Sequence, residues 1–210
     1  MFRWLFASMY DTVNRSSEKA GLSQERQQLL AQARGDTIEI GAGTGLNLAH
    51  YPEAVTRLVL TEPDRHMEGR LRRRVAAIRP NAEVLAVSAA QLPFPDASFD
   101  TAVVTFVLCS VPDPAAALTE ISRVLRPGGR LLFLEHVRSE DPTVAAKQDR
   151  RPLPYRLIGC YPNRTTLDTI AASPLRVEDV RHGEVPKAPR TERPMIVGTA
   201  RRLATTPNRV

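Results

Sequence analysis

Three glycines at alternate positions follow a short β-branched run in the segment IEIGAGTG, residues 38–45. A strand that ends in a glycine-rich turn is typical of α/β proteins, because glycine lets the backbone turn sharply and approach a ligand closely. A tight turn without any ligand is the alternative interpretation. Turns of this kind bind several nucleoside ligands, so the turn by itself does not identify one.

Apolar segments that look like strands alternate with helical patterns along the chain. This alternation predicts a parallel sheet with helices on both faces. The predicted strands cover residues 37–40, 57–62, 83–87, 101–108, 130–137, 175–180 and 195–202. The predicted helices are one with Met67, Leu71, Val75 and Ile78 on a single stripe, one over residues 114–125 with Asp113 as its N-cap, and a short one over residues 165–172. Residues 140–160 are interpreted as a proline-rich insertion.

The size and composition are those of one ordinary globular domain. A chain of 210 residues is long enough to bury a full sheet, and 42% of it is hydrophobic and 25% charged. The two cysteines, Cys109 and Cys160, have no framework spacing, so we expect neither a disulfide scaffold nor a metal site. Two unpaired thiols are typical of a reducing compartment, and a cytoplasmic location is therefore expected.

The charge and the apolar runs bear on whether the chain binds nucleic acid or a membrane. The formal net charge is +6, and much of it comes from Arg70, Arg72, Arg73 and Arg74. We expect these arginines to form a solvated helix face, with an anionic partner as the alternative. No aromatic residues are interleaved with them, so nucleic-acid binding is not expected. The longest apolar run, residues 102–111, is shorter than the roughly 20 residues of a membrane span, and the N-terminus is not a convincing signal peptide.

Two acidic residues accompany the glycine turn. Glu39 lies two residues before the first glycine, where it would repel a pyrophosphate and could attract an ammonium group. Glu62 ends the second predicted strand, where a carboxylate can accept hydrogen bonds from both ribose hydroxyls. The spacing G-x-G-x-G also differs from the dinucleotide fingerprint G-x-G-x-x-G. These charges favour S-adenosylmethionine (SAM), which carries an α-amino group and a sulfonium and has no phosphate.

Four segments, in this order, resemble class I SAM-dependent methyltransferases. They are EIGAGTG at residues 39–45, Glu62, LPFPDASFD at residues 92–100, and RVLRPGGRLLFLEH at residues 123–136. The resemblance implies a doubly wound, mostly parallel seven-stranded sheet whose last strand is antiparallel. It also implies a single domain over residues 1–210, with an N-terminal helical lid (1–34), a SAM-binding core (35–137), and an acceptor-side insertion with the C-terminal strands (138–210).

A narrower set of segments is similar to the animal methyltransferase-like 7 group. These segments are TFVLCSVPDP, FLEHV, IGC followed by NRTTLD, and the final GTA. Members of that group methylate alkyl thiols and are anchored to membranes by an N-terminal segment, which is not evident here. The wider branch includes phospholipid N-methyltransferases and quinone C-methyltransferases, so these acceptors remain alternatives to a thiol.

The resemblance assigns roles to individual positions. The glycines would let the backbone approach the methionine part of SAM, Glu39 would lie near its amino group, and Glu62 would hold the ribose. Ser88 and Ala89 would contact adenine, although relatives often have an acidic residue in that segment. The predicted cofactor-binding residues are Tyr10, Glu39, Gly41, Ala42, Gly43, Gly45, Glu62, Pro63, Ser88, Ala89, Thr105 and Phe106.

Methyl transfer needs few catalytic groups. A thiolate attacks the methyl in line, and at a pKa near 8.5 a few per cent of a thiol is already ionised at neutral pH. Glu135 and His136 end the fifth predicted strand, where neighbouring side chains point to opposite faces, so one of them can face the pocket. We expect His136 to accept a proton or position the acceptor, with a structural histidine as the alternative. Cys109 is interpreted as a small buried side chain.

The N-terminal segment has an apolar helical face formed by Phe2, Leu5, Phe6, Met9 and Val13. Three interpretations remain open: a lid over the acceptor pocket, a helix lying on a membrane surface, or a dimer contact. A lid would place Tyr10 within reach of the SAM carboxylate.

The sequence therefore predicts a SAM-dependent methyltransferase that acts on a small lipophilic acceptor and releases S-adenosylhomocysteine. Two other classes remain as alternatives. A nicotinamide-dependent oxidoreductase is disfavoured by the glycine spacing and Glu39. A SAM-binding regulatory protein without turnover is the second alternative, because bases are sparse and an acidic adenine contact is missing.

Overall fold

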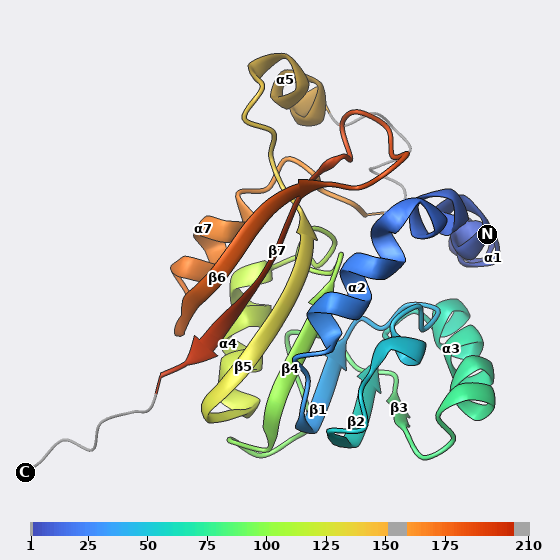
Figure 1. Cartoon of the computed structure of the whole chain (residues 1–210), viewed down its shortest axis with the longest axis vertical. Helices are drawn as coiled ribbons and strands as arrows, with labels where there is room; N and C mark the ends of the chain where they lie inside the picture. Colours follow the sequence, from blue (N-terminus) through green and yellow to red (C-terminus); the bar gives the residue numbers. More distant parts are fainter. Residues whose placement is uncertain (1, 151–158, 204–210) are drawn as a thin grey trace, which may run out of the picture.

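The described residues form a seven-stranded sheet between two layers of helices (Figure 1). The computed structural model describes residues 2–150 and 159–203, with side chains from Ala7 onward. The strand order is β3-β2-β1-β4-β5-β7-β6. The strands are β1 Gly35–Ile40, β2 Val55–Thr61, β3 Glu83–Leu85, β4 Phe99–Thr105, β5 Leu125–His136, β6 Leu175–Glu184 and β7 Pro194–Arg202.

Strands β1 to β5 pair in parallel, whereas β7 runs antiparallel to both of its neighbours, β5 and β6. This arrangement confirms the predicted doubly wound sheet with an antiparallel last strand. The chain builds β1, β2 and β3 outward in one direction and then returns to place β4 beside β1. The crossing from one half of the sheet to the other therefore lies between β1 and β4.

Successive side chains along a strand point to opposite faces of the sheet, so the sheet has a separate hydrophobic core on each face. On β4 and β5, Val104 and Phe133 face the core covered by α4 (Pro114–Val124) and α7 (Thr166–Ala171). Val103 and Leu132, one position away on each strand, face the opposite core with α2 (Ser23–Leu30) and α3 (Arg65–Ile78). Strands buried on both faces read as continuous apolar runs, which explains the pattern of the central segments.

Two helix starts follow directly from their capping residues. The Asp64 side chain accepts hydrogen bonds from the backbone N–H groups of His66 and Met67 at the start of α3. Asp113 accepts from Ala116 N–H at the start of α4, where Pro114 takes the first position, as predicted. Such caps stabilise a helix by about 1 kcal/mol each.

Several predicted boundaries were wrong. β5 begins at Leu125, so the RPGG segment belongs to the strand, and β6 continues to Glu184 because it pairs with β7 as far as Pro194. The expected insertion contains a helix, α5 (Pro142–Arg150), followed by residues 151–158, which lie outside the described part. Ile78 is 45% exposed, whereas the other three residues of its predicted stripe, Met67, Leu71 and Val75, are buried.

The N-terminal segment is helical up to Leu30. Helix α1 (Phe2–Ser17) passes through a π-helical turn (Glu18–Leu22) into α2, with a bend at Gly21, whose φ is 131°. The side chains of residues 2–6 lie outside the described part, so the predicted apolar face is described only at Met9 and Val13, which are 50% and 65% exposed. Among the described residues, none of the helices combines the length and apolar character of a membrane span.

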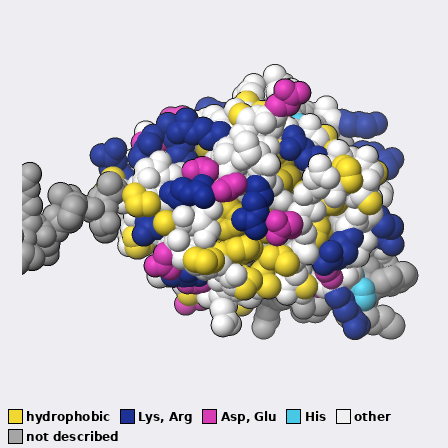
Figure 2. Space-filling view, turned by 90° about the horizontal axis from the view of Figure 1, so that it is seen from below, with side chains coloured by type: hydrophobic (Ala, Val, Ile, Leu, Met, Phe, Trp, Pro, Cys, Tyr) yellow, Lys and Arg dark blue, Asp and Glu magenta, His cyan; other side chains and the backbone are white. Residues whose placement is uncertain are grey.

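Basic and acidic side chains are interspersed on the face of the molecule seen in Figure 2. Several basic side chains of the described residues form ion pairs. Arg126, for example, bridges Asp36 at 2.8 Å and Asp100 at 2.5 Å. In the arginine-rich helix α3, Arg72 pairs with Glu68 and Arg74 with Asp11, so part of that positive charge is neutralised within the chain.

Candidate active site

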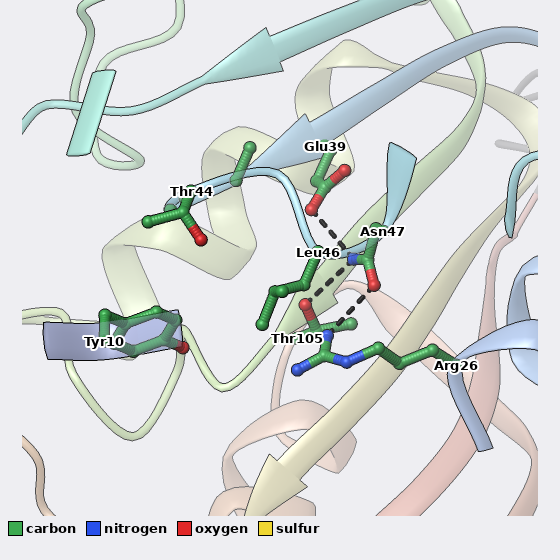
Figure 3. A pocket seen from close by; sticks show the side chains of 10 residues that line it. Tyr10, Arg26, Glu39, Thr44, Leu46, Asn47 and Thr105 are labelled. Carbon is green, nitrogen blue, oxygen red and sulfur yellow. Dashed lines mark hydrogen bonds between the residues drawn. The ribbon is translucent and has the colours of Figure 1, made fainter. Parts of the chain in front are cut away.

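A cleft opens at the carboxyl ends of β1 and β4, the two neighbouring strands between which the strand order reverses. Open α/β sheets bind ligands at this position, because the loops after the two strands diverge there. The cleft is open to solvent, and about 250 Å³ of atom-free space lies in it when that open part is counted. Its lining residues are Tyr10, Arg26, Glu39, Gly41, Ala42, Gly43, Thr44, Leu46, Asn47 and Thr105 (Figure 3).

The glycine turn needs its glycines for two reasons. Gly41 has a φ of 64°, and a Cβ there would lie 2.8 Å from Val107 Cγ2, so a side chain is excluded by both the backbone and the space. Gly43 has a φ of 58°, and a Cβ there would meet no atom within 4 Å. The turn leads into a short 3-10 helix (Leu48–His50).

Glu62 occupies the place in this turn where a diphosphate would bind. Its Oε2 accepts a 2.8 Å hydrogen bond from Gly43 N–H, and its Oε1 accepts one of 2.8 Å from Asp64 N–H. The backbone donor that a phosphate would use is therefore already bound to a carboxylate of the protein. Each carboxylate oxygen can accept a second hydrogen bond, so Glu62 can still receive ribose hydroxyls.

Glu39 is buried at the base of the cleft and bonded on both oxygens. Asn47 Nδ2 donates to Oε1 at 2.8 Å, and the Tyr51 hydroxyl donates to Oε2 at 2.7 Å. Burial raises the pKa of Glu39 to about 7, although these two hydrogen bonds oppose the shift. A cation in the cleft would favour the ionised form of this carboxyl group.

Arg26 brings a positive charge to the cleft opposite Glu39. It is only 3% exposed and extends from α2. Its Nε donates to Glu18 at 3.0 Å, and its NH1 donates to Asn47 Oδ1 at 2.9 Å. Asn47 also donates to Thr105 Oγ1 at 3.0 Å, so one amide links the arginine, the carboxylate and the end of β4 (Figure 3). The cleft thus contains separated positive and negative groups.

Helix α1 closes one side of the cleft. Tyr10 lines it, and burial raises the pKa of the Tyr10 hydroxyl to about 12. The next residue, Asp11, accepts a 2.5 Å hydrogen bond from Thr44 Oγ1 and a 2.6 Å hydrogen bond from Arg74 NH2. These two contacts join α1 to the glycine turn and to α3.

The predicted cofactor-binding residues fall into two groups. The lining residues include Tyr10, Glu39, Gly41, Ala42, Gly43 and Thr105. Gly45, Glu62, Pro63, Ser88, Ala89 and Phe106 are not among them. Ser88 and Ala89 follow β3 in a loop, where Ala89 is buried and Ser88 is exposed. Their proposed contact with adenine remains a prediction.

The loop after β4 is held by Glu135. This carboxylate is fully buried and accepts hydrogen bonds from three consecutive backbone N–H groups, Val107 at 2.8 Å, Leu108 at 2.9 Å and Cys109 at 3.1 Å. Burial raises the pKa of Glu135, and the three donors oppose that shift. Both of its oxygens bind this loop in the interior, so the contacts of Glu135 are those of a residue that holds the loop, and its predicted role as a base remains a prediction.

His136 lies beside the cleft instead. Its ring packs against Phe106, with 4.4 Å between the ring centroids, and Phe106 directly follows the lining residue Thr105. Phe106 adopts a left-handed backbone conformation with φ of 59°, which is strained for a side chain of this size. His136 Nδ1 is 3.7 Å from Cys109 Sγ. Hydrogen bonding with Cys160, followed by burial, raises the pKa of the Cys109 thiol well above its usual value.

The chain is similar in sequence to known methyltransferases. A family model described as "Methyltransferase domain" matches residues 38–133. Human thiol S-methyltransferase TMT1B is 35% identical over 147 residues, which are 65% of this chain and 58% of that protein. The phosphatidylethanolamine N-methyltransferase of Cereibacter sphaeroides is 34% identical over 119 residues, or 54% of this chain and 57% of that protein. The chain therefore spans less than two thirds of both relatives.

A solved SAM-dependent methyltransferase from Thermotoga maritima has the same fold. It superposes with a TM-score of 0.70 over 95% of this chain and 97% of that chain, at 24% sequence identity. Residues 38–133 match a methyltransferase domain. The cleft fits SAM, because Glu39 and Arg26 offer opposite charges to its amino acid group. The backbone N–H of Gly43, which could otherwise bind a phosphate, is already bonded to Glu62.

Four of the lining residues were not predicted from the sequence, namely Arg26, Thr44, Leu46 and Asn47. Arg26 lies in a polar helical segment in which nothing distinguishes it from solvated arginines. Asn47 lies two residues after the last glycine of the turn and is only 1% exposed. Its burial depends on the short 3-10 helix that follows it, which the sequence pattern does not reveal.

Proposed function

We propose that the protein transfers the methyl group of SAM to a small lipophilic thiol and releases S-adenosylhomocysteine and a methyl thioether. The opposed charges of Arg26 and Glu39, linked through Asn47 inside one cleft, carry the assignment of the donor. The similarity to a human thiol S-methyltransferase supports a thiol as the acceptor.

In the proposed complex, the amino acid part of SAM lies between these two charges. Its ammonium group is placed against Glu39, and its carboxylate receives the Arg26 guanidinium, a stronger donor than the Tyr10 hydroxyl proposed from the sequence. Glu62 accepts the ribose hydroxyls, and the loop at Ser88–Ala89 lies beside adenine. Thr105 and Phe106 border the methyl group at the end of β4.

The reaction is an in-line displacement at the methyl carbon. The acceptor sulfur forms the new S–C bond as a thiolate, and the C–S bond of the sulfonium breaks with its electron pair left on the departing sulfur. The positive charge of the donor is lost in this step, so alignment and exclusion of water contribute most of the rate. His136 is the imidazole next to Phe106, where it can accept the thiol proton or position the acceptor.

Helix α1 is proposed as a lid over the cofactor. This proposal is supported by the contacts of Asp11 with Thr44 and Arg74 and by Tyr10 in the cleft wall. The exposed side chains of Met9 and Val13 offer the same helix a peripheral membrane contact, which would concentrate lipophilic acceptors near the cleft.

A phospholipid amine is the second candidate acceptor. It is favoured by the similarity to the phosphatidylethanolamine N-methyltransferase of Cereibacter sphaeroides. The two acceptors differ in their demands, because an amine needs to be deprotonated before attack, whereas a fraction of a thiol is already ionised at neutral pH.

Incubation with methyl-labelled SAM distinguishes these candidates. The full chain is given short alkyl thiols, vesicles containing phosphatidylethanolamine, and a reduced quinone, each in a separate reaction. We expect label in a thioether and little in the other products. Label in the lipid or the quinol alone would replace the thiol assignment, and SAM binding without any labelled product would favour a regulatory protein.

A further inference from the structure

Three metal-ligating side chains from distant parts of the sequence meet beside the methyl-transfer region. Cys109 follows β4, His136 is the last residue of β5, and Cys160 precedes α7. His136 Nδ1 lies 3.7 Å from Cys109 Sγ and 3.8 Å from Cys160 Sγ. All three ligand atoms lie within 4.8 Å of one another.

The two sulfur–nitrogen separations match the edges of a tetrahedral metal site. Zinc binds cysteine sulfur at about 2.3 Å and histidine nitrogen at about 2.0–2.1 Å, which places the two ligand atoms roughly 3.6 Å apart. The two measured sulfur–nitrogen distances are within a few tenths of an ångström of that value. A donor set of two thiolates and one imidazole suits zinc and does not suit magnesium or calcium.

The protein holds the cluster in place without help from a ligand. Glu135 accepts from Cys109 N–H, and Cys109 C=O accepts a 2.7 Å hydrogen bond from Tyr161 N–H, the residue after Cys160. Arg164 donates to Val111 C=O at 2.7 Å, which joins the same two segments a second time. The backbone on either side of the cluster is therefore fixed, and a metal would find its ligands already gathered.

The position of the cluster relates it to the acceptor. The His136 ring packs against Phe106, and Phe106 follows Thr105 in the wall of the cleft. Two cysteines and one histidine leave the fourth position of a tetrahedral zinc for a water or a substrate. A thiol is a soft sulfur ligand of the same kind as the two cysteines.

We propose that Cys109, His136 and Cys160 bind one zinc ion, which takes the acceptor thiol as its fourth ligand. On binding, the thiol gives its proton to water and forms a sulfur–zinc bond as a thiolate. The same sulfur then attacks the methyl carbon of SAM, S-adenosylhomocysteine departs with the electron pair of the broken bond, and the neutral thioether leaves the metal. This assigns His136 a ligand role in place of proton acceptance, and the acceptor part rests on the proposed function.

Metal content tests the site independently of any activity. The full chain, prepared without a histidine tag and under reducing conditions, is reconstituted with zinc, dialysed, and analysed for metal. We expect about one zinc per chain, and loss of most of it in Cys109→Ser and Cys160→Ser. His182→Gln, which changes an exposed histidine on β6, should retain the metal. A folded wild-type chain without zinc, or with Cys109 and Cys160 joined as a disulfide, would overturn the proposal.

Cobalt replaces zinc for the second measurement, which uses only the wild-type chain. Two thiolate ligands and tetrahedral geometry should give sulfur-to-cobalt charge-transfer bands and intense visible bands. Addition of an alkyl thiol should change the visible bands, whereas the corresponding alcohol should not. A spectrum indifferent to thiols would overturn the fourth-ligand role. A thiol response without thiol methylation would instead count against the proposed function and leave the metal site standing.

Discussion

Asn47 Nδ2 lies 2.8 Å from Glu39 Oε1, inside a cleft that also contains the Arg26 guanidinium. The same amide accepts from Arg26 NH1 through its oxygen, so it keeps the two opposite charges apart while bonded to both. Without Asn47, a buried arginine and a buried carboxylate would be free to pair directly. The arrangement leaves both charges available to a zwitterionic amino acid group such as that of SAM.

Replacement of Arg26 tests where the cofactor carboxylate binds. Arg26→Gln should weaken SAM binding roughly 10–100-fold, because a buried charge-assisted hydrogen bond is lost. The same variant should bind a SAM analogue without the carboxylate about as well as the wild type does. Calorimetric titration with both ligands measures the difference, and Arg57→Gln, which removes a surface ion pair with Glu83, is the control. Equal losses for both ligands would contradict the assignment.

Replacement of Glu62 tests the ribose contact. Glu62→Ala should weaken SAM binding by about 1–3 kcal/mol through lost charge-assisted hydrogen bonds. Glu68→Ala serves as the control, because Glu68 pairs with Arg72 on the surface of α3. An unchanged dissociation constant in Glu62→Ala would refute the contact.

The raised pKa of Glu39, about 7, predicts a pH-dependent stability. Between its ordinary value of 4.5 and about 7, the folded chain retains a proton that the unfolded chain has released. The free energy of unfolding should therefore fall as the pH rises through this window, by roughly 3 kcal/mol from this group.

Urea unfolding at pH 5 and pH 8 measures this contribution. The variant Glu39→Gln cannot titrate, so its stability relative to the wild type should be greater at pH 8 than at pH 5. Glu140→Gln, at an exposed position, supplies the baseline. A difference between Glu39→Gln and wild type that does not change with pH would show that Glu39 is ionised throughout.

The structural role of Glu135 predicts a loss of stability. Glu135→Ala leaves three buried backbone N–H groups of the loop after β4 without their acceptor. The free energy of unfolding should fall by about 3 kcal/mol or more, since each unsatisfied buried donor costs about 1–3 kcal/mol. Thermal unfolding measures this effect. A variant as stable as the wild type would indicate that water replaces the carboxylate.

The local patterns in the sequence predicted most of the fold, whereas long-range contacts could not be predicted. The alternation of strands and helices and the cap at Asp113 depend on neighbouring residues, and the structure reproduces them. Glu39 was identifiable because it accompanies a glycine turn. Arg26 was not, because its burial depends on how α2 packs on the sheet.

The same limit applies to the acceptor side. Strand alternation predicted that only one of Glu135 and His136 would face the pocket, but the choice depended on the path of the loop after β4. Cys109 lies close to Cys160 because the backbone N–H of Tyr161 donates to Cys109 C=O, which holds residues 160–161 beside the loop after β4. Cysteine spacing along the chain contains no information about this contact, so the proximity of the two thiols could not be predicted from the sequence.

The central claim is that this cleft binds the amino acid part of SAM between Arg26 and Glu39. A crystal structure of the chain with S-adenosylhomocysteine tests it most directly. We predict the ligand carboxylate within hydrogen-bond distance of Arg26, its ammonium beside Glu39, and its ribose on Glu62. A ligand bound elsewhere, or in this cleft with its amino acid group away from both residues, would contradict the account.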